Sequence, residues 1–185
     1  MRIPIFLSYP KPHMALQQQF IKAIVEYLQD HGFEPRTLGV TDYDMSAPLK
    51  AIRRLMLESN GLITVALKRT HVLSSRVRAG ADLPDAAETT QDNSWLTSPY
   101  CQIEPAMAYQ LGLPILLLRE KGVIADGLLE RGVVGSYMPE FDLAKPLKEY
   151  FNASGWKDVI GRWEGFVRAV VETKGNPPKL FEALI

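Results

Sequence analysis

The sequence contains little cysteine, which restricts how its fold is stabilised. Cys101 is the only cysteine among 185 residues, so no internal disulfide can form, and we expect a protein of the reducing cytoplasm. The three histidines, at 13, 31 and 71, lie far apart in the sequence, and no second thiol accompanies Cys101. We therefore expect no metal site.

Neither sign of charge predominates, and no apolar run is long. The 21 Lys and Arg residues balance 21 Asp and Glu residues, whereas nucleic-acid-binding proteins usually carry a basic excess. The longest apolar run, residues 111–118, contains Gly112 and Pro114 and is too short to span a bilayer. Residues 1–4 lack the pattern of a signal peptide. We expect neither a nucleic-acid partner nor a membrane partner.

Short apolar segments alternate with amphipathic segments along most of the chain. Strands are predicted at 3–8, 33–38, 62–67, 114–119 and, weakly, at 133–134 or 137–141; helices are predicted at 13–31, 46–59, 98–112, 124–131, 143–152 and 156–173. This alternation predicts an α/β fold with a mainly parallel sheet of about five strands. The economical topology is flavodoxin-like, with strand order 2-1-3-4-5. We expect an α/β domain at 1–153 and a C-terminal helical extension at 154–185 packed on it.

Residues 68–93 show no sustained periodicity, and we expect them to form a long mobile loop. In a sheet of this topology, ligands bind at the carboxyl ends of the strands, between the first and third strands. The segments that leave those two strands are residues 9–12 and 68–93. The functional site is therefore expected beside these segments.

Several sequence motifs of catalysis are absent. The chain has no Gly-rich phosphate loop with Lys-Ser or Lys-Thr, no G-x-G-x-x-G after the first strand and no G-x-S-x-G elbow. One segment, residues 98–109, is informative. Ser98 and Pro99 are typical of a helix start, and Pro105 is expected to kink the helix or to move its start.

Glu104 of this segment lies near the helix start, beside the expected crevice. A glutamate at this position can be simply solvated and favoured by the helix dipole. However, its neighbours Ile103, Ala106, Met107 and Ala108 are apolar, which favours a carboxyl group that faces a pocket.

These residues resemble the Toll/interleukin-1 receptor (TIR) domain family. Ile5-Phe6-Leu7-Ser8-Tyr9 is similar to the first strand of the family, and residues 98–104 are similar to its S-x-W-C-x-x-E box, with Tyr100 in place of Trp. Glu58-Ser59-Asn60-Gly61 resembles the segment before its third strand. The resemblance covers about residues 1–141 and implies that Glu104 is catalytic, as in the members that cleave NAD. Pro105 and a longer segment before Ser98 depart from the family pattern.

A second resemblance competes with the first. Glu104-x-Ala106-x-Ala108, followed by residues 111–115, is similar to a segment of nucleoside 2-deoxyribosyltransferases, which use that glutamate as a nucleophile. Ala106 stands where that family has Gly, and no Asp-Gly pair precedes Glu104. Ser98 and Cys101 favour the TIR-like interpretation. Both families place a glutamate beside a ribosyl C1′–N bond.

Six further residues are candidates for binding the substrate: Phe6, Ser8, Tyr9, Asp44, Trp95 and Cys101. Phe6 is either a core residue or a contact for a nucleobase. Ser8 and Tyr9 either line a nucleotide pocket or form a plain turn. Asp44 belongs to the segment that forms a mobile loop over the site in TIR-like proteins, and Trp95 either packs or stacks on nicotinamide.

The TIR resemblance implies an NAD glycohydrolase or cyclase of the bacterial, Thoeris-like type. NAD is then the substrate and no cofactor is expected. The product is ADP-ribose or a cyclic isomer that serves as a signal in antiphage defence, and self-assembly and a protein effector partner are implied. The alternatives are a deoxyribosyltransferase-like enzyme and a non-catalytic TIR-like interaction domain.

Overall fold

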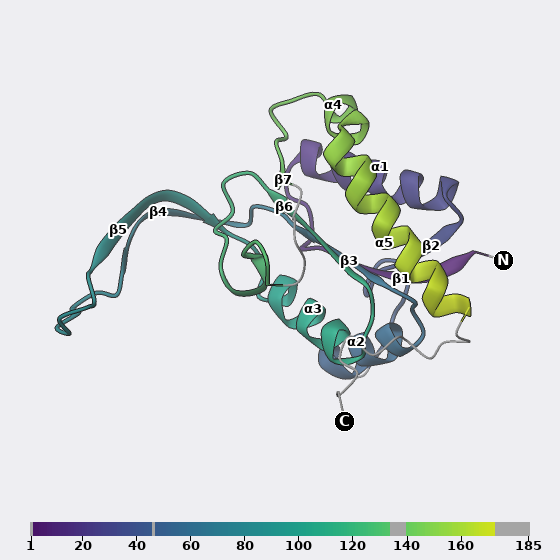
Figure 1. The fold of residues 1–185 in the computed structure, drawn as a ribbon, viewed down its shortest axis with the longest axis horizontal. Helices are drawn as coiled ribbons and strands as arrows, with labels where there is room; N and C mark the ends of the chain where they lie inside the picture. Colours follow the sequence, from purple (N-terminus) through teal and green to yellow (C-terminus); the bar gives the residue numbers. More distant parts are fainter. Residues whose placement is uncertain (1, 46, 134–139, 173–185) are drawn as a thin grey trace.

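The chain forms an α/β fold with one five-stranded parallel sheet (Figure 1), seen in a computed structural model that describes residues 2–45, 47–133 and 140–172. The strands are β1 (Ile3–Ser8), β2 (Phe33–Arg36), β3 (Leu62–Ala66), β4 (Thr70–Val77), β5 (Thr89–Leu96), β6 (Ile115–Glu120) and β7 (Glu140–Phe141). The helices are α1 (Ala15–Asp30), α2 (Pro48–Leu57), α3 (Tyr100–Gln110), a 3₁₀ turn (Gly127–Leu129), α4 (Leu147–Asn152) and α5 (Ser154–Glu172).

The sheet order is β2-β1-β3-β6-β7, with every neighbouring pair parallel. With the sheet strands counted alone, this is the flavodoxin-like order 2-1-3-4-5, so the predicted fold class and topology are confirmed. The central strands are mainly apolar because both of their faces are covered by helices. All five residues of β3, for example, are buried.

Two layers of helices cover the sheet. Alternate residues of β1 show this division: Ile5 and Leu7 belong to a core cluster with α1 and α5 residues, whereas Phe6 packs with residues of α2. Figure 1 shows α1, α4 and α5 on one side of the sheet and α2 and α3 on the other. Because side chains alternate along a strand, every second residue of β1 and β3 points toward α2 and α3.

The helix α5 is part of the main core. Its buried residues Trp156, Ile160, Trp163 and Val167 pack in one cluster with β1, β3 and α1, and the Trp163 indole N–H donates a hydrogen bond to the Pro114 carbonyl at 3.2 Å. The predicted extension at 154–185 thus begins with a helix that is packed on the sheet. Residues 173–185 lie outside the described part of the chain.

Residues 68–93 were expected to lack regular structure, and this prediction is wrong. They form most of an antiparallel ribbon in which β4 pairs with β5 from Thr70↔Leu96 to Val77↔Thr89. Figure 1 shows this ribbon projecting far from the body of the molecule. Nearly all of its side chains are exposed or half-buried, so neither face needs the apolar alternation that reveals a strand in a sequence.

Smaller differences concern the ends of elements. The helix predicted at 124–131 is reduced to the 3₁₀ turn at 127–129, and the weak strand at 137–141 is seen only as β7, because 134–139 lie outside the described residues. Ser46, the first residue of the helix predicted at 46–59, also lies outside them. Pro105 lies inside α3 without ending it.

Candidate active site

The helix α3 presents four buried residues to the rest of the molecule: Cys101, Glu104, Pro105 and Ala108. Their spacing of three and four residues puts them on one helical face. Cys101 packs with Ala66 of β3, and Ala108 packs with Phe6 of β1 and Leu62 of β3. Glu104, which lies between Cys101 and Ala108 on this face, therefore points at the sheet.

The start of α3 follows the predicted Ser98-Pro99 signal. The Ser98 hydroxyl accepts a hydrogen bond from the Tyr100 N–H at 3.3 Å, and the Ser98 carbonyl accepts one from the Cys101 N–H at 2.9 Å. This start lies directly after β5, so the exposed ribbon leads into the helix that carries Glu104.

The Glu104 side chain is a carboxyl group with little access to water. The residue is only 8% exposed. Burial raises the pKa of its carboxyl group to about 7, and a smaller opposing effect of Ser8 lowers this pKa. The Ser8 hydroxyl is close enough to act on this pKa, although no hydrogen bond of ordinary geometry joins the two groups. A carboxyl group in this state changes its charge near neutral pH.

Two buried hydroxyl groups lie on the same side of the sheet. Ser8 of β1 is paired in register with Thr64 of β3. Both side chains point toward α3, because their strand neighbours Leu7, Ile63 and Val65 belong to the cluster on the opposite face. Within the described chain, neither Ser8 Oγ nor Thr64 Oγ1 has a hydrogen-bond partner.

Buried hydroxyl groups without partners are uncommon, because each loses its hydrogen bonds to water. Here two of them share a sheet face with a carboxyl group that is itself desolvated. The site can therefore offer a ligand one carboxylate and two hydroxyl groups. Thr64 was not predicted, since a threonine within an apolar strand is typical of ordinary β-structure.

Cys101 and Phe6 lie near Glu104 but are core residues. Phe6 is buried among residues of α2 and β3. Cys101 is buried, and burial raises the pKa of its thiol to about 11, while the Thr97 hydroxyl donates a hydrogen bond to its Sγ at 3.5 Å. Such a thiol is protonated at neutral pH and does not act as a nucleophile.

Tyr9 and Trp95 lie on different sides of the sheet, and Trp95 packs against the cluster that contains Cys101 of α3. Tyr9 packs against the cluster of α1 and α5, on the other face of the sheet from Ser8. Trp95 lies at the base of the ribbon, where its ring stacks on His71 at 4.5 Å between centroids and the Lys68 ammonium lies 5.6 Å from its ring. Backbone hydrogen bonds join Trp95 to Gly122 and Ile124.

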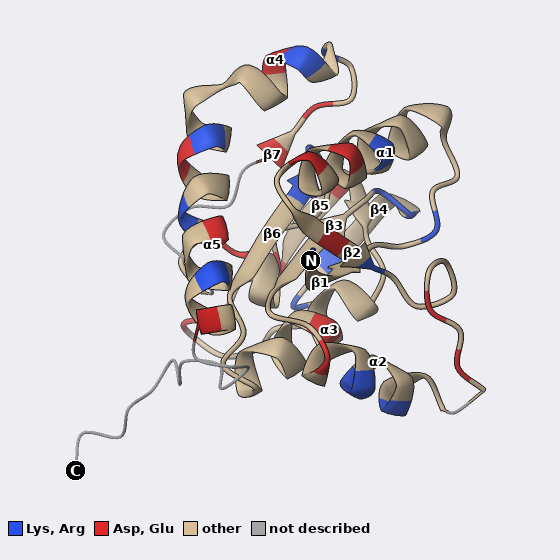
Figure 2. Cartoon of the chain, turned by 90° about the vertical axis from the view of Figure 1, so that its right-hand side faces the viewer, with Lys and Arg blue, Asp and Glu red and all other residues tan. Residues whose placement is uncertain are grey.

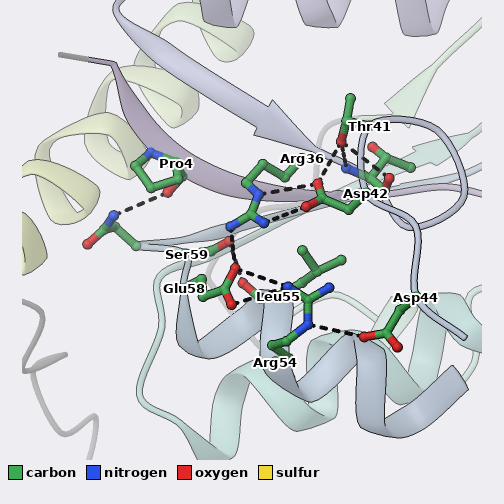
Figure 3. Close-up of polar contacts among 11 residues, drawn as sticks. Pro4, Arg36, Thr41, Asp42, Asp44, Arg54, Leu55, Glu58 and Ser59 are labelled. Atoms are coloured by element: carbon green, nitrogen blue, oxygen red, sulfur yellow. Dashed lines mark hydrogen bonds and ion pairs between the residues drawn. The ribbon is translucent and has the colours of Figure 1, made fainter. Parts of the chain in front are cut away.

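Asp44 lies in the segment between β2 and α2, within a series of ion pairs (Figure 3). Arg36 at the end of β2 binds Asp42 and Glu58, and Arg54 of α2 binds Glu58 and, at 3.1 Å, Asp44. These contacts tie the segment to α2. Asp44 also lines a pocket of about 360 Å³, together with Leu38, Tyr43, Met45, Pro48 and Ala51.

A further buried carboxylate, which the sequence analysis did not single out, fixes the edge of the sheet. Glu120 at the end of β6 accepts hydrogen bonds from the Lys68 N–H at 2.8 Å and from the Gln17 amide at 3.1 Å. Gln17 also donates to the Lys68 carbonyl at 2.9 Å. These three residues join α1, the segment after β3 and the end of β6, so they hold the carboxyl ends of the two strands in place.

In the described ranges, no group of three or more His, Cys, Asp or Glu side chains is arranged to hold a metal ion. None of the helices described is both long and apolar enough to cross a membrane.

Comparisons with solved structures give distant similarities, and two of them are informative about the fold. No family model and no curated protein sequence matches the chain. The CMP N-glycosidase BcmB of Clostridium botulinum is similar with a TM-score of 0.45 and 17% identity, over 80% of this chain and 93% of that one. The TIR domains of the activated Roq1 resistosome, which recognises the effector XopQ, are similar with a TM-score of 0.41 and 14% identity. The similarity covers 92% of this chain and 84% of that one. Similarities of this size assign neither a family nor an activity.

Proposed function

We propose that this protein cleaves the N-glycosidic bond between a ribosyl C1′ and a base, as a TIR-like enzyme with NAD as its substrate. The observation that carries the proposal is Glu104, a buried carboxyl group with a pKa of about 7 that faces the sheet between β1 and β3. The TIR-like motifs around Ser8 and Glu104 support this assignment, and they point to NAD among the nucleotides.

The chemistry requires a negative charge beside the sugar. When the C1′–N bond of NAD breaks, its electron pair leaves with the nicotinamide nitrogen and positive charge develops at C1′ and the ring oxygen. The ionised Glu104 carboxylate stabilises that charge in a site that holds little water. Water then adds to C1′ and loses a proton to give ADP-ribose, or a nucleophile of the substrate adds to give a cyclic isomer.

The two hydroxyl groups have a complementary role in this proposal. In the described chain neither Ser8 Oγ nor Thr64 Oγ1 has a hydrogen-bond partner of ordinary geometry, so a ribose hydroxyl would satisfy each of them. Hydrogen bonds of this kind orient the sugar relative to Glu104 and are gained only when the ligand is in place.

Purified wild-type protein and Glu104→Gln are incubated with NAD, and nicotinamide release is measured. The substitution keeps the shape of the side chain and removes its charge, so we expect at least about a hundredfold loss of rate. Glu26→Gln, at an exposed glutamate of α1, is the matched control and should keep full activity. Far-UV circular dichroism checks that each variant is folded.

The same preparations are incubated with a deoxynucleoside and a free base. Exchange of the base without nicotinamide release would show a deoxyribosyltransferase-like enzyme instead. A folded Glu104→Gln protein with full NAD-cleaving activity would exclude the proposed role of Glu104. No reaction with either substrate, at every protein concentration tested, would favour an interaction domain.

A further inference from the structure

Two cationic side chains stand at the carboxyl end of β3, where the chain leaves the sheet and enters the ribbon. Lys68 is half-buried and Arg69 is exposed, and neither forms an ion pair with a described residue. The helix α3 has no cation of its own, because Glu104 is its only charged residue. Ligands of a parallel sheet bind at the carboxyl ends of its strands, so both cations lie at the edge where a ligand is expected.

The backbone at these two residues is fixed by hydrogen bonds. The Lys68 N–H donates to the Glu120 carboxylate at 2.8 Å, and the Lys68 carbonyl accepts from the Gln17 amide at 2.9 Å. The Arg69 N–H donates to the Leu96 carbonyl at 3.0 Å, shortly before α3 begins. A fixed backbone limits the space that the two cationic groups explore, so less freedom is lost when they bind an anion.

Both side chains lie beside the start of α3. The Lys68 ammonium lies 5.6 Å from the centre of the Trp95 ring, and Trp95 packs against the cluster that contains Cys101. Burial raises the pKa of the Cys101 thiol, the Glu104 carboxylate adds to this effect, and the Arg69 guanidinium opposes it. Cys101 is therefore within electrostatic range of both the acid and the cation.

The separation between Glu104 and the cations suits a small sugar. Cys101 and Glu104 are three residues apart in α3, which at 1.5 Å rise per residue is about 4.5 Å along the helix axis. One ribose ring has this size. The pKa of Glu104 is set by burial and by Ser8, so Arg69 is not the counter-ion of this carboxyl group and is available to another anion.

We propose that Lys68 and Arg69 bind the phosphate groups of a substrate whose ribose lies at Glu104. This inference rests on the proposed function and names the substrate class of the site, which is a nucleotide and not a nucleoside. The Arg69 guanidinium offers a fork of N–H donors that matches two phosphate oxygens, and Lys68 adds a second positive charge. The two cations also offset the repulsion between the ionised Glu104 carboxylate and an anionic substrate.

Binding of ADP-ribose tests this subsite without catalysis, because the molecule has ribose and phosphate groups but no bond to nicotinamide. Isothermal titration calorimetry should give a dissociation constant at least about tenfold weaker for Lys68→Met with Arg69→Met than for the wild type, since two charge-assisted contacts are lost. Methionine keeps the apolar stem of each side chain. Arg69→Lys alone keeps the charge and loses the fork, so its affinity should be intermediate. Thermal denaturation checks that each variant is folded.

Lys157→Met with Arg162→Met is the matched control, because it removes the same two kinds of charge elsewhere. Both residues are exposed on α5, which packs on the opposite face of the sheet from α3. Figure 2 shows basic and acidic residues distributed along this helix. The control protein should bind ADP-ribose with the affinity of the wild type.

Two substrates that share the scissile bond extend the test to turnover. NAD and nicotinamide riboside contain the same nicotinamide–ribose bond, and only NAD carries phosphate groups. The preference of the wild type for NAD in kcat/KM should fall at least about tenfold in the Lys68→Met, Arg69→Met protein. If neither compound releases nicotinamide, the proposed function fails, and the titration with ADP-ribose still decides the subsite. No binding of ADP-ribose by the wild type, or unchanged affinity in the double variant, would overturn the proposal.

Discussion

The carboxyl group of Glu104 couples the stability of the protein to pH. Its pKa is raised from 4.5 to about 7 by burial, so the folded state binds a proton that the unfolded state releases between these values. The stabilisation from this bound proton is complete below the pKa that Glu104 has in the unfolded state. It is lost as the pH rises through the pKa that Glu104 has in the folded state. Ionised Glu104 thus lowers the free energy of unfolding at neutral and higher pH.

Glu104→Gln removes the buried charge and with it this destabilisation. We expect the variant to exceed the wild type in free energy of unfolding at pH 8, by up to roughly 3 kcal/mol, because one pKa unit corresponds to about 1.4 kcal/mol. At pH 5 the difference should be much smaller. Urea denaturation of both proteins at pH 5 and pH 8 measures this difference in free energy of unfolding. If the difference were the same at the two pH values, the Glu104 carboxyl group would not be desolvated.

Ser8 acts on Glu104 by lowering its pKa. Ser8→Ala should therefore raise the pKa of Glu104 above 7 and move the rising limb of the pH–rate profile to higher pH. Carbon-13 NMR of the glutamate carboxyl groups follows the titration directly. Thr64→Val, at the neighbouring position in β3, is the control and should leave this pKa nearly unchanged. A Ser8→Ala protein with an unshifted titration would contradict the contact.

The sequence indicated that Glu104 faces the interior of the fold, but it did not indicate the surroundings of this residue. Glu104 was indicated by apolar neighbours in a helix and by two family resemblances. Thr64 was missed because a strand pattern shows which residues are β-branched and not which buried hydroxyl lacks a partner. Tyr9 and Ser8 are adjacent in sequence, and only the strand pleat sends them to opposite faces of the sheet.

Close contact between α5 and the start of β3 depends on a residue without a side chain. A Cβ atom at Gly61 would lie 2.6 Å from Val167 Cγ2 and 3.2 Å from Trp163 Cζ2. Gly61→Ala should destabilise the protein by about 1–3 kcal/mol, the usual range for an overpacked core. Thermal denaturation with van't Hoff analysis gives the value.

Two variants make this test specific. In a Val167→Ala background, Gly61→Ala should cost clearly less, because the methyl group that it meets is gone. Gly161→Ala, in α5 with open space around the added Cβ, should raise stability by up to about 1 kcal/mol, since alanine favours helix over glycine. A Gly61→Ala protein as stable as the wild type would show that α5 moves freely on the sheet.

The elements that could be predicted are those that bury apolar residues. The strands β1, β3 and β6 are apolar runs, and the helices α1 and α5 have an apolar period, because they pack in the core. The helix α3 was indicated by its Ser98-Pro99 start. The positions of all six elements were found within a few residues. The ribbon of β4 and β5 escaped prediction because both of its faces meet solvent, so its residues Thr70–Val77 and Thr89–Leu96 have no period to read.

The molecule as a whole divides into a packed body and a projecting ribbon. The residues of β4 from Thr70 to Val77 belong to none of the three core clusters, and in β5 only Trp95 packs against one of them. The ribbon leaves the body after β3 and returns at α3, so it is joined directly to the helix that carries Glu104.

Replacement of residues 72–94 by Asn-Gly tests this division. His71 and Trp95 are paired across the ribbon, and a two-residue Asn-Gly turn closes an antiparallel pair of strands. We expect the free energy of unfolding, measured in urea at a concentration where the protein is monomeric, to change by less than about 1 kcal/mol, because no core contact is lost. A loss of several kcal/mol in the monomer would show that the ribbon stabilises the body of the same chain, and the division into body and arm would then be wrong.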